Sequence, residues 1–169
     1  MKPILYTLVA GALCSVPIFA QAASSTSADQ KFVDAAAQTD MMEAHLAQVA
    51  QDQAAEQSVK DYAQTLNSDH TKDYQQLSDA ATKAGLTVPK GLDAMHDRMM
   101  APLEKLKGAA FDHKYISEMI VGHEKAITQY KKEATEAKSP DIQSYANAAL
   151  PVLQKHLDGA KDLAKQKTK

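Results

Sequence analysis

Four polar residues occupy helical stripes that are otherwise apolar: Glu43, His70, His123 and His156. In the stretch LNSDHTKDYQQL, for example, His70 lies four residues after Leu66 and four before Tyr74. Residues at this spacing share one face of a helix. A carboxylate or imidazole on a buried face costs free energy unless it has a partner. These four residues are therefore the first candidates for chemistry.

Three imidazoles and one carboxylate that converge in a core form a ligand set for a divalent ion such as Zn²⁺, Fe²⁺ or Mn²⁺. The sequence therefore predicts one metal ion held by the four residues. Nearby carboxylates would accept hydrogen bonds from the outer imidazole nitrogens: Asp69, Asp73, Glu118 and Glu124. The alternative is a metal-free polar network in which the histidines bond Glu43 or a tyrosine: Tyr62, Tyr74, Tyr130 or Tyr145.

A second set of candidate ligands lies in the stretch AMHDRMM: Met95, His96, Met99 and Met100. Thioethers and imidazole are soft ligands that suit Cu⁺, which makes a copper site the minor alternative for a bound metal. The interpretation we favour is that the three methionines form one face of a short helix that packs on the rest of the protein.

Four long helices are expected to position the four polar residues. Helix-forming residues dominate, and β-branched runs and hairpin dipeptides are nearly absent, which indicates an all-α protein. Apolar residues recur at helical spacing over about 29–54, 57–84, 111–137 and 140–166. Ser27 and Gln30 have the spacing of a capping box for the first helix, and Gly85 is a C-terminal cap for the second.

The connections between these helices differ in length. If Glu43 and His70 face one core, the chain must turn near 53–58, because residues 27 apart lie on opposite sides of one continuous helix. Residues of about 85–110 contain three glycines and two prolines and form a long crossover between helices 2 and 3. Short joins within each pair and one long crossover predict a ferritin-like four-helix bundle. The alternative is a simple bundle with an ordered loop.

The four polar residues also agree in depth. Glu43 and His70 lie about 12 and 15 residues from the first expected turn, and His123 and His156 about 16 and 17 residues from residue 139. At about 1.5 Å per residue, the differences in height are roughly 4.5 Å and 1.5 Å. We therefore expect the four side chains to meet in one layer.

The order of these motifs resembles a known family. Phe32 and Glu43, followed by VKDYAQTLNSDH, GAAFDHKYISEMIVGHE and LPVLQKHLDGA, are similar to the exported bacterial domain-of-unknown-function family 4142. That family is grouped with ferritin-like helical bundles. The resemblance therefore implies a ferritin-like fold and export, and it brings no established activity.

The ligand pattern departs from that of ferritin-like di-iron proteins. Those proteins use a Glu-x-x-His pair on each of two helices and a further Glu on each of the others. Here the residues three positions before the histidines are Asn67, Ile120 and Leu153. Bridging carboxylates are scarce, so a single ion fits better, and ferroxidase or oxygenase activity is disfavoured.

The first 22 residues have the features of a secretory leader. Lys2 provides a short positive start, residues 4–20 are mostly apolar, and Ala20-Gln21-Ala22 has the form of a cleavage site. A membrane anchor is the alternative, but Pro17 interrupts the apolar run. We therefore predict a signal peptide over 1–22 and export, with the periplasm as the expected location.

The remaining chain, 23–169, is expected to form a single domain without cysteine, because Cys14 is the only one in the chain. Disulfides and thiolate chemistry are thereby excluded from that domain. The 169-residue chain has 19 basic and 21 acidic residues, and its net charge of −2 argues against nucleic acid as a partner. We expect no transmembrane segment after cleavage. The sequence leaves the oligomeric state open.

Together these patterns predict an exported metal-binding protein that serves metal buffering or protection against envelope stress. The sequence contains no Gly-x-Ser-x-Gly motif and no glycine-rich phosphate loop, so an enzymatic role is disfavoured. The alternative is a non-catalytic structural or interaction protein of the envelope, in which the four residues form a polar core network.

Overall fold

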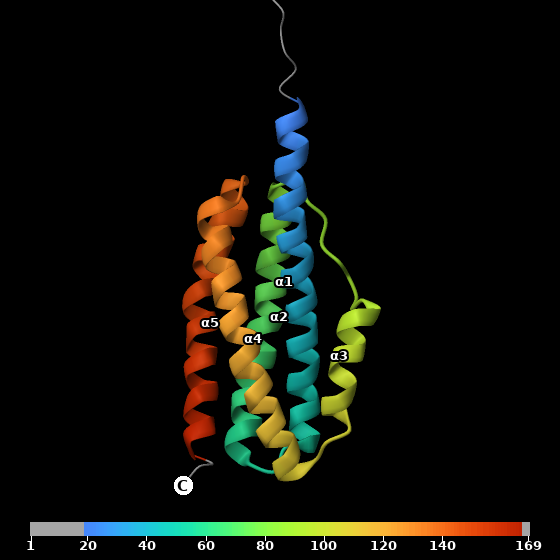
Figure 1. Cartoon of the computed structure of the whole chain (residues 1–169), viewed down its shortest axis with the longest axis vertical. Helices are drawn as coiled ribbons and strands as arrows, with labels where there is room; N and C mark the ends of the chain where they lie inside the picture. Colours follow the sequence, from blue (N-terminus) through green and yellow to red (C-terminus); the bar gives the residue numbers. More distant parts are fainter. Residues whose placement is uncertain (1–18, 167–169) are drawn as a thin grey trace, which may run out of the picture.

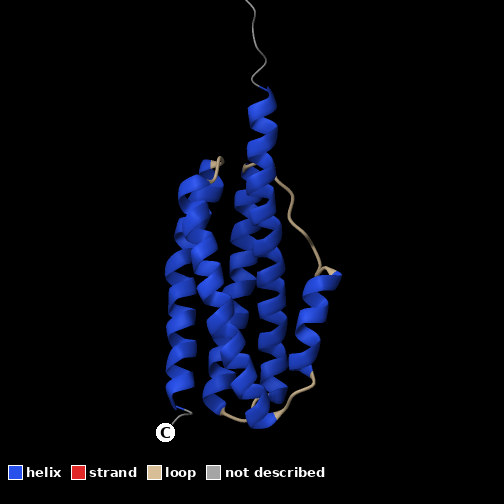
Figure 2. Ribbon diagram, in the orientation of Figure 1, coloured by secondary structure: helices blue, strands red, loops and turns tan. Residues whose placement is uncertain are grey.

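The computed structural model describes residues 19–166 of the chain, and the side chains from Ala28 on. This part contains five helices: α1 (Phe19–Gln53), α2 (Gln57–Lys83), α3 (Ala94–Glu104), α4 (Gly108–Glu136) and α5 (Pro140–Gln166). Figure 2 shows helices and loops, and no strand occurs between residues 19 and 166. The predicted all-α class is confirmed. The signal peptide predicted over 1–22 lies outside the residues whose side chains are described, so it stays a prediction.

The four long helices run along the long axis of the molecule, and α3 lies beside α1 on the outside (Figure 1). α1 packs mainly on α2, and α4 packs mainly on α5, so the chain forms two helical hairpins. Contacts between α2 and α5 and between α1 and α4 join the hairpins. The segment from the end of α2 through α3 leads from one end of the bundle to the other, where α4 begins (Figure 1). Within the described part, no helix is both long and apolar enough to span a membrane.

The observed boundaries of α2, α4 and α5 agree closely with the predicted ranges. The start of α1 does not, because the helix begins at Phe19, about ten residues before the predicted start. The capping box predicted at Ser27 and Gln30 is therefore wrong. The Gln30 amide instead donates to the Thr87 backbone oxygen at 2.7 Å and accepts from the Thr87 N–H at 3.0 Å. Gln30 thus fastens the loop after α2 to the first helix.

The predicted cap at the end of α2 is present. Gly85 has a positive φ of 69°. Leu86 N donates to Ala81 O at 2.8 Å, and Gly85 N donates to Thr82 O at 3.1 Å. These two bonds form a Schellman motif, which requires the left-handed backbone that glycine adopts without strain.

Two buried carboxylates fasten the turns of the two hairpins. Asp112 on α4 accepts hydrogen bonds of 3.0 and 3.1 Å from the backbone N–H groups of residues 55–56, between α1 and α2. Asp29 on α1 accepts hydrogen bonds of 3.1 and 2.8 Å from those of residues 138–139, between α4 and α5. Each carboxylate therefore lies at the N-terminus of a helix in the other hairpin, where the helix dipole favours a negative charge.

A constant shift of 83 positions relates the two hairpins. Under this shift Asp29 is equivalent to Asp112, and residues 55–56 are equivalent to residues 138–139. Tyr62 is likewise equivalent to Tyr145, and their hydroxyl groups donate to positions 156 and 73, which differ by the same shift. The repeated contacts make α4 the structural equivalent of α1, and α5 the equivalent of α2.

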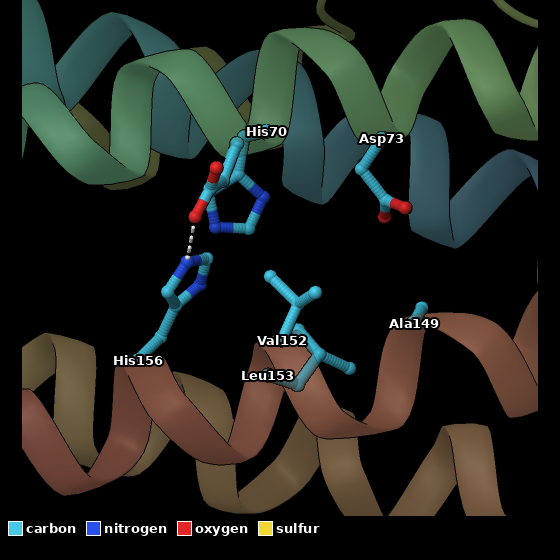
Figure 3. Close-up of a pocket in the computed structure, with 7 residues that line it drawn as sticks. His70, Asp73, Ala149, Val152, Leu153 and His156 are labelled. Atoms are coloured by element: carbon cyan, nitrogen blue, oxygen red, sulfur yellow. Dashed lines mark hydrogen bonds and ion pairs between the residues drawn. The ribbon is translucent and has the colours of Figure 1, made fainter.

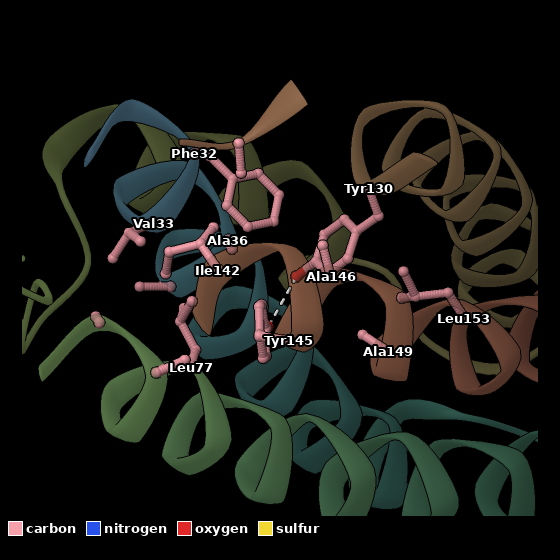
Figure 4. Close-up of a cluster of buried hydrophobic side chains, with 14 of the residues drawn as sticks. Phe32, Val33, Ala36, Leu77, Tyr130, Ile142, Tyr145, Ala146, Ala149 and Leu153 are labelled. Atoms are coloured by element: carbon pink, nitrogen blue, oxygen red, sulfur yellow. Dashed lines mark hydrogen bonds between the residues drawn. The ribbon is translucent and has the colours of Figure 1, made fainter. Parts of the chain in front are cut away.

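The buried apolar side chains form two clusters. Between them lies a polar layer, which consists of Glu43, His70, His123 and His156. One cluster includes Phe32, Leu77, Tyr130 and Ile142 (Figure 4). The other includes Leu46, Val59, Tyr115 and Leu163. On α1, α2 and α4, the predicted polar residue lies between the stretch that enters one cluster and the stretch that enters the other. Two apolar cores therefore flank the layer along the helices.

Candidate metal centre

The structure brings the four predicted ligands together in the polar layer, one from each long helix. Glu43, His70, His123 and His156 are at most 3% exposed. His70 Nε2 lies 3.0 Å from Glu43 Oε2, and His123 Nε2 lies 3.5 Å from the same oxygen. His123 Nε2 also lies 3.3 Å from His156 Nδ1. The atoms that face one another come from helices that are far apart in the sequence.

The three histidines form a cluster that could hold a metal ion, because one nitrogen of each lies within 4.8 Å of the other two. In a tetrahedral site with metal–ligand bonds of about 2.0–2.1 Å, neighbouring ligand atoms are about 3.3 Å apart. Three of the six separations among the four ligand atoms, 3.0, 3.3 and 3.5 Å, are close to that value, and the histidine nitrogens all lie within 4.8 Å of one another. Glu43 is the carboxylate that adjoins two of the three rings.

Each imidazole has an inner nitrogen, which faces the cluster, and an outer nitrogen, which faces away from it. A hydrogen bond at the outer nitrogen orients each ring. The outer nitrogens of His70, His123 and His156 lie 2.9, 2.8 and 2.9 Å from Asp40 Oδ1, the Met119 backbone oxygen and Asp69 Oδ2. A carbonyl or carboxylate oxygen only accepts, so each outer nitrogen is the donor, and in a neutral ring the inner nitrogen carries the lone pair. When all three rings are neutral, three lone pairs therefore converge, which is how proteins orient histidine ligands of a metal.

Hydrogen bonding does not satisfy all the inner atoms when the rings are neutral. His70 Nε2 and Glu43 Oε2 are 3.0 Å apart; with the His70 proton on Nδ1 both atoms are acceptors and neither has a hydrogen bond within the described part of the chain, whereas a doubly protonated His70 would donate to Glu43. His123 Nε2 and His156 Nδ1 face each other, and in the neutral tautomers set by their outer bonds both are acceptors. Buried polar atoms normally have partners. A cation at the centre of the cluster would satisfy all four atoms.

The electrostatics of the layer favour a cation beside Glu43. Burial opposes ionisation of this carboxyl group, but His123 and His70 outweigh burial and lower its pKa to about 2. Burial disfavours a charge on His70, but Glu43 and Asp40 raise its pKa well above the usual 6.5. Burial lowers the pKa of His156 to about 4. Without a metal ion, His70 therefore carries the proton that balances Glu43, while His156 is neutral.

Asp40 is a residue of the site that sequence reasoning missed. It is 2% exposed, and its Oδ1 atom accepts the hydrogen bond from His70 Nδ1. Burial raises the pKa of Asp40 to about 7. Asp40 lies three residues before Glu43, on the same face of α1, and this spacing is the signal that could have revealed it.

Of the four carboxylates predicted to orient the histidines, Asp69 alone contacts a ring of the cluster. Asp73 accepts a hydrogen bond from the Tyr145 hydroxyl instead. Glu118 and Glu124 form ion pairs with lysines on the surface. The tyrosines named for a metal-free network also bond elsewhere, to backbone oxygens, to Asp73 or to each other.

A small hollow lies beside the cluster, between α2 and α5 (Figure 3). Its volume is about 10 Å³, which is room for about one water molecule. Its lining comprises Asp69, His70, Asp73, Ala149, Val152, Leu153 and His156. Two of the three clustered histidines therefore border a space that also contacts two carboxylates.

The residues predicted as copper ligands do not share one buried face of α3. Met95 and Met99 on α3 are 55% and 59% exposed, whereas Met100 is 3% exposed and packs into a core cluster. The His96 ring bonds Asp93, which also caps α3. The favoured interpretation, one packed face of three methionines, is wrong for Met95 and Met99, because the helix turns these two side chains away from the face that carries Met100.

The fold and the site define an all-α helical bundle with a buried cluster of three histidines. Residues 15–163 match the family described as Domain of unknown function (DUF4142), and the chain belongs to that family. The family predicted from the sequence motifs is therefore confirmed. No curated protein and no solved structure matches the chain.

Proposed function

We propose that this protein holds one divalent metal ion in its polar layer and serves metal buffering or protection against envelope stress. One observation carries the proposal: three inner nitrogens and the Glu43 carboxylate face one another, and hydrogen bonding does not satisfy them all. The spacing of these atoms, close to the edge of a coordination tetrahedron, supports the same conclusion.

Each residue of the layer has a defined part in this proposal. Glu43 supplies the negative charge, and His70, His123 and His156 supply neutral nitrogen donors. Asp40, Asp69 and the Met119 carbonyl group orient the rings through their outer nitrogens. The donor set suits Zn²⁺, and it also suits Fe²⁺ or Mn²⁺ when further ligands complete the coordination. When bound, such an ion supplies a Lewis-acid centre.

We also propose that the four long helices form a ferritin-like four-helix bundle, with α3 and its flanking loops as the crossover between helices 2 and 3. The two hairpins and the long segment that joins opposite ends of the bundle support this assignment. The convergence of one polar side chain from each long helix supports it further, because bundle cores hold metal sites in this way.

A single ion is favoured over a dinuclear centre. Dinuclear sites in ferritin-like proteins need bridging carboxylates from both hairpins. Under the 83-residue shift, the equivalents of Glu43 and His70 are Ala126 and Leu153. The second hairpin therefore lacks a carboxylate to bridge a second ion, and oxidase chemistry of the di-iron type is disfavoured.

We propose export to the periplasm on the basis of the leader over 1–22, which leaves a domain of residues 23–169. The second candidate function is a non-catalytic structural or interaction protein of the envelope. It is favoured by the proton on His70, because a protonated His70 beside Glu43 is a buried ion pair that needs no metal ion. The two functions differ in whether the native protein contains metal.

Elemental analysis of the leaderless protein, purified without affinity tags or chelators, tests the proposal. We expect about one divalent ion per chain, lost in His70→Ala and in His123→Ala, because each change removes one of four ligands. His113→Ala is the matched control, since His113 is exposed on α4, and it should retain the ion. Native protein that is metal-free, and that gains no stability from Zn²⁺, Fe²⁺ or Mn²⁺, would rule out the metal site and favour the structural role.

A further inference from the structure

The seam between α2 and α5 is fastened by a tyrosine on each side of the histidine cluster. Tyr62 donates to the His156 backbone oxygen at 2.9 Å, and its ring lies so near Gly159 that an added Cβ would come within 3.1 Å of it. Tyr145 donates to Asp73 at 2.8 Å. The two residues that accept these bonds, His156 and Asp73, both line the hollow beside the cluster (Figure 3).

The hollow lies between partly exposed side chains and two of the proposed ligands. The side chain of Asp69 is 31% exposed, and Val152 is 39% exposed. His70 and His156, which border the same hollow, are each 2% exposed. Asp69 also accepts a hydrogen bond from His156, so a single carboxylate contacts both solvent and the ring of a ligand.

We propose that divalent cations reach and leave the metal centre through this hollow, between Asp69 and Asp73 on α2 and Val152 on α5. The two carboxylates would attract the incoming ion and exchange with its water ligands, because carboxylate oxygen binds divalent cations directly. Val152 would limit the passage, since its apolar side chain lines the hollow between α2 and α5 (Figure 3) and is itself partly exposed. This inference rests on the proposed function and assigns the route by which the site is filled.

The size of the hollow implies that the passage widens transiently. Room for about one water molecule is too small for a hydrated cation. The ion must therefore lose water ligands or wait for α2 and α5 to separate slightly. In either case the rate of exchange depends on the volume of the side chain at position 152, while the affinity depends on the four ligands.

The seam between α1 and α4 is the competing route. Gly122 on α4 has no side chain to cover Glu43, and an added Cβ would lie 3.6 Å from Glu43 Oε1. That distance is an ordinary van der Waals contact, so Gly122→Ala narrows this route without forcing the structure apart. The two seams can therefore be narrowed one at a time.

Stopped-flow measurement of Co²⁺ binding to the metal-free protein tests the route, with the visible absorption of bound Co²⁺ as the signal. Val152→Phe should lower the association and dissociation rate constants by the same factor, about tenfold, and leave the affinity unchanged. Val152→Ala should raise both rate constants. Val121→Phe is the matched control, because Val121 is 61% exposed on α4 and lies away from the hollow, and its rates should equal those of the unmodified protein.

The outcomes separate the route from the site. Equal rates in Val152→Phe, Val152→Ala and Val121→Phe would overturn the proposed route, and slower exchange in Gly122→Ala alone would assign it to the seam between α1 and α4. In both cases Co²⁺ still binds, so the metal site stands. Failure of the unmodified protein to bind Co²⁺, Zn²⁺, Fe²⁺ or Mn²⁺ would instead remove the proposed function, and the route with it.

Discussion

The first hairpin (α1 and α2) and the second (α4 and α5) share an architecture but contribute different side chains to the polar layer. At equivalent positions, the first hairpin carries Asp40, Glu43, His70 and Asp73, and the second carries His123, Ala126, Leu153 and His156. The contacts that hold the turns and the seam are repeated under the 83-residue shift, from Asp29 to Asp112 and from Tyr62 to Tyr145. The framework is symmetric, and the site is not.

This difference explains how one ion can be held between two equivalent halves. All the buried carboxylates of the layer come from the first hairpin, whereas the second supplies two imidazoles and two apolar residues. A symmetric set of carboxylates would repel across the layer unless two cations neutralised it. With Glu43 as the single carboxylate that faces the histidines, one divalent ion is enough.

The largest expected effect tests whether the two hairpins are fastened alike. Asp112→Ala and Asp29→Ala should each lower the free energy of unfolding by about 2–4 kcal/mol, because each removes a buried charged acceptor from two backbone N–H groups. Unfolding of the metal-free protein by urea measures both values. The matched Asp→Asn variants keep one acceptor oxygen and should lose less. A large loss in only one of the two Ala variants would break the equivalence.

A smaller effect separates the outer partners of the two hairpins' histidines. At pH 8, above the Asp40 pKa of about 7, Asp40→Asn should weaken Zn²⁺ binding by about 10–100-fold, because it removes the charge that orients His70 and increases its basicity. Asp69→Asn should weaken Zn²⁺ binding less, by about tenfold or below, since the Asp69 side chain is 31% exposed and water can replace its contact with His156. Competition with a chromophoric chelator measures both affinities. A larger loss of affinity in Asp69→Asn than in Asp40→Asn would show that burial of the carboxylate does not decide how much it contributes to Zn²⁺ binding.

The protonation states of the two hairpins differ as well, and metal binding should reveal the difference. The pKa of His70 is raised and that of His156 is lowered to about 4, so near neutral pH the proton that competes with the ion is on His70. Affinity for Zn²⁺ should therefore increase with pH, by about tenfold per unit, until the pH exceeds the raised pKa of His70. Isothermal titration calorimetry in buffers of different ionisation enthalpy measures the proton released. Affinity that does not change between pH 6 and pH 8 would contradict this assignment.

The smallest expected effect compares the two tyrosines of the seam. Tyr62→Phe should lower the free energy of unfolding by about 0.5–1 kcal/mol, because it removes one hydrogen bond to a backbone oxygen. Tyr145→Phe should cost about 1–1.5 kcal/mol, because its hydroxyl contacts both Asp73 and Tyr130. Thermal and urea unfolding measure the two values. Equal losses would indicate that the contact with Tyr130 adds nothing to stability.

Much of the fold could be predicted because helical periodicity is a local property of the chain. The ranges of α2, α4 and α5 follow from the recurrence of apolar residues, and Gly85 ends α2 through a local backbone conformation. The start of α1 could not be predicted in this way. The alanine-rich stretch before residue 29 forms helix without an apolar stripe, so the pattern contained no sign of it.

The candidate site was predicted from the same local pattern, and the prediction failed where that pattern does not show which way a side chain faces. Glu43, His70, His123 and His156 were identified because each interrupts an apolar stripe at a similar depth. Asp40 was missed, because a second polar residue one turn away from the first reads as the edge of the stripe. On α3, the spacing of Met95, Met99 and Met100 did not reveal which methionines face the bundle, since a short helix can present either side.

The sequence alone determined where the apolar stripe of each long helix lies and which four polar residues interrupt it, because a helix repeats every 3.6 residues whatever surrounds it. The tertiary structure alone decided which nitrogen of His70 and of His156 faces the cluster, because the carboxylates that orient these two rings lie on other helices. The ring of His123 is oriented locally, by the Met119 backbone oxygen one turn earlier on α4. The tertiary structure also decided that Asp29 fastens a turn 109 residues away. Such contacts depend on the rotation and height of packed helices, and these are set by the whole core rather than by any local stretch of the chain.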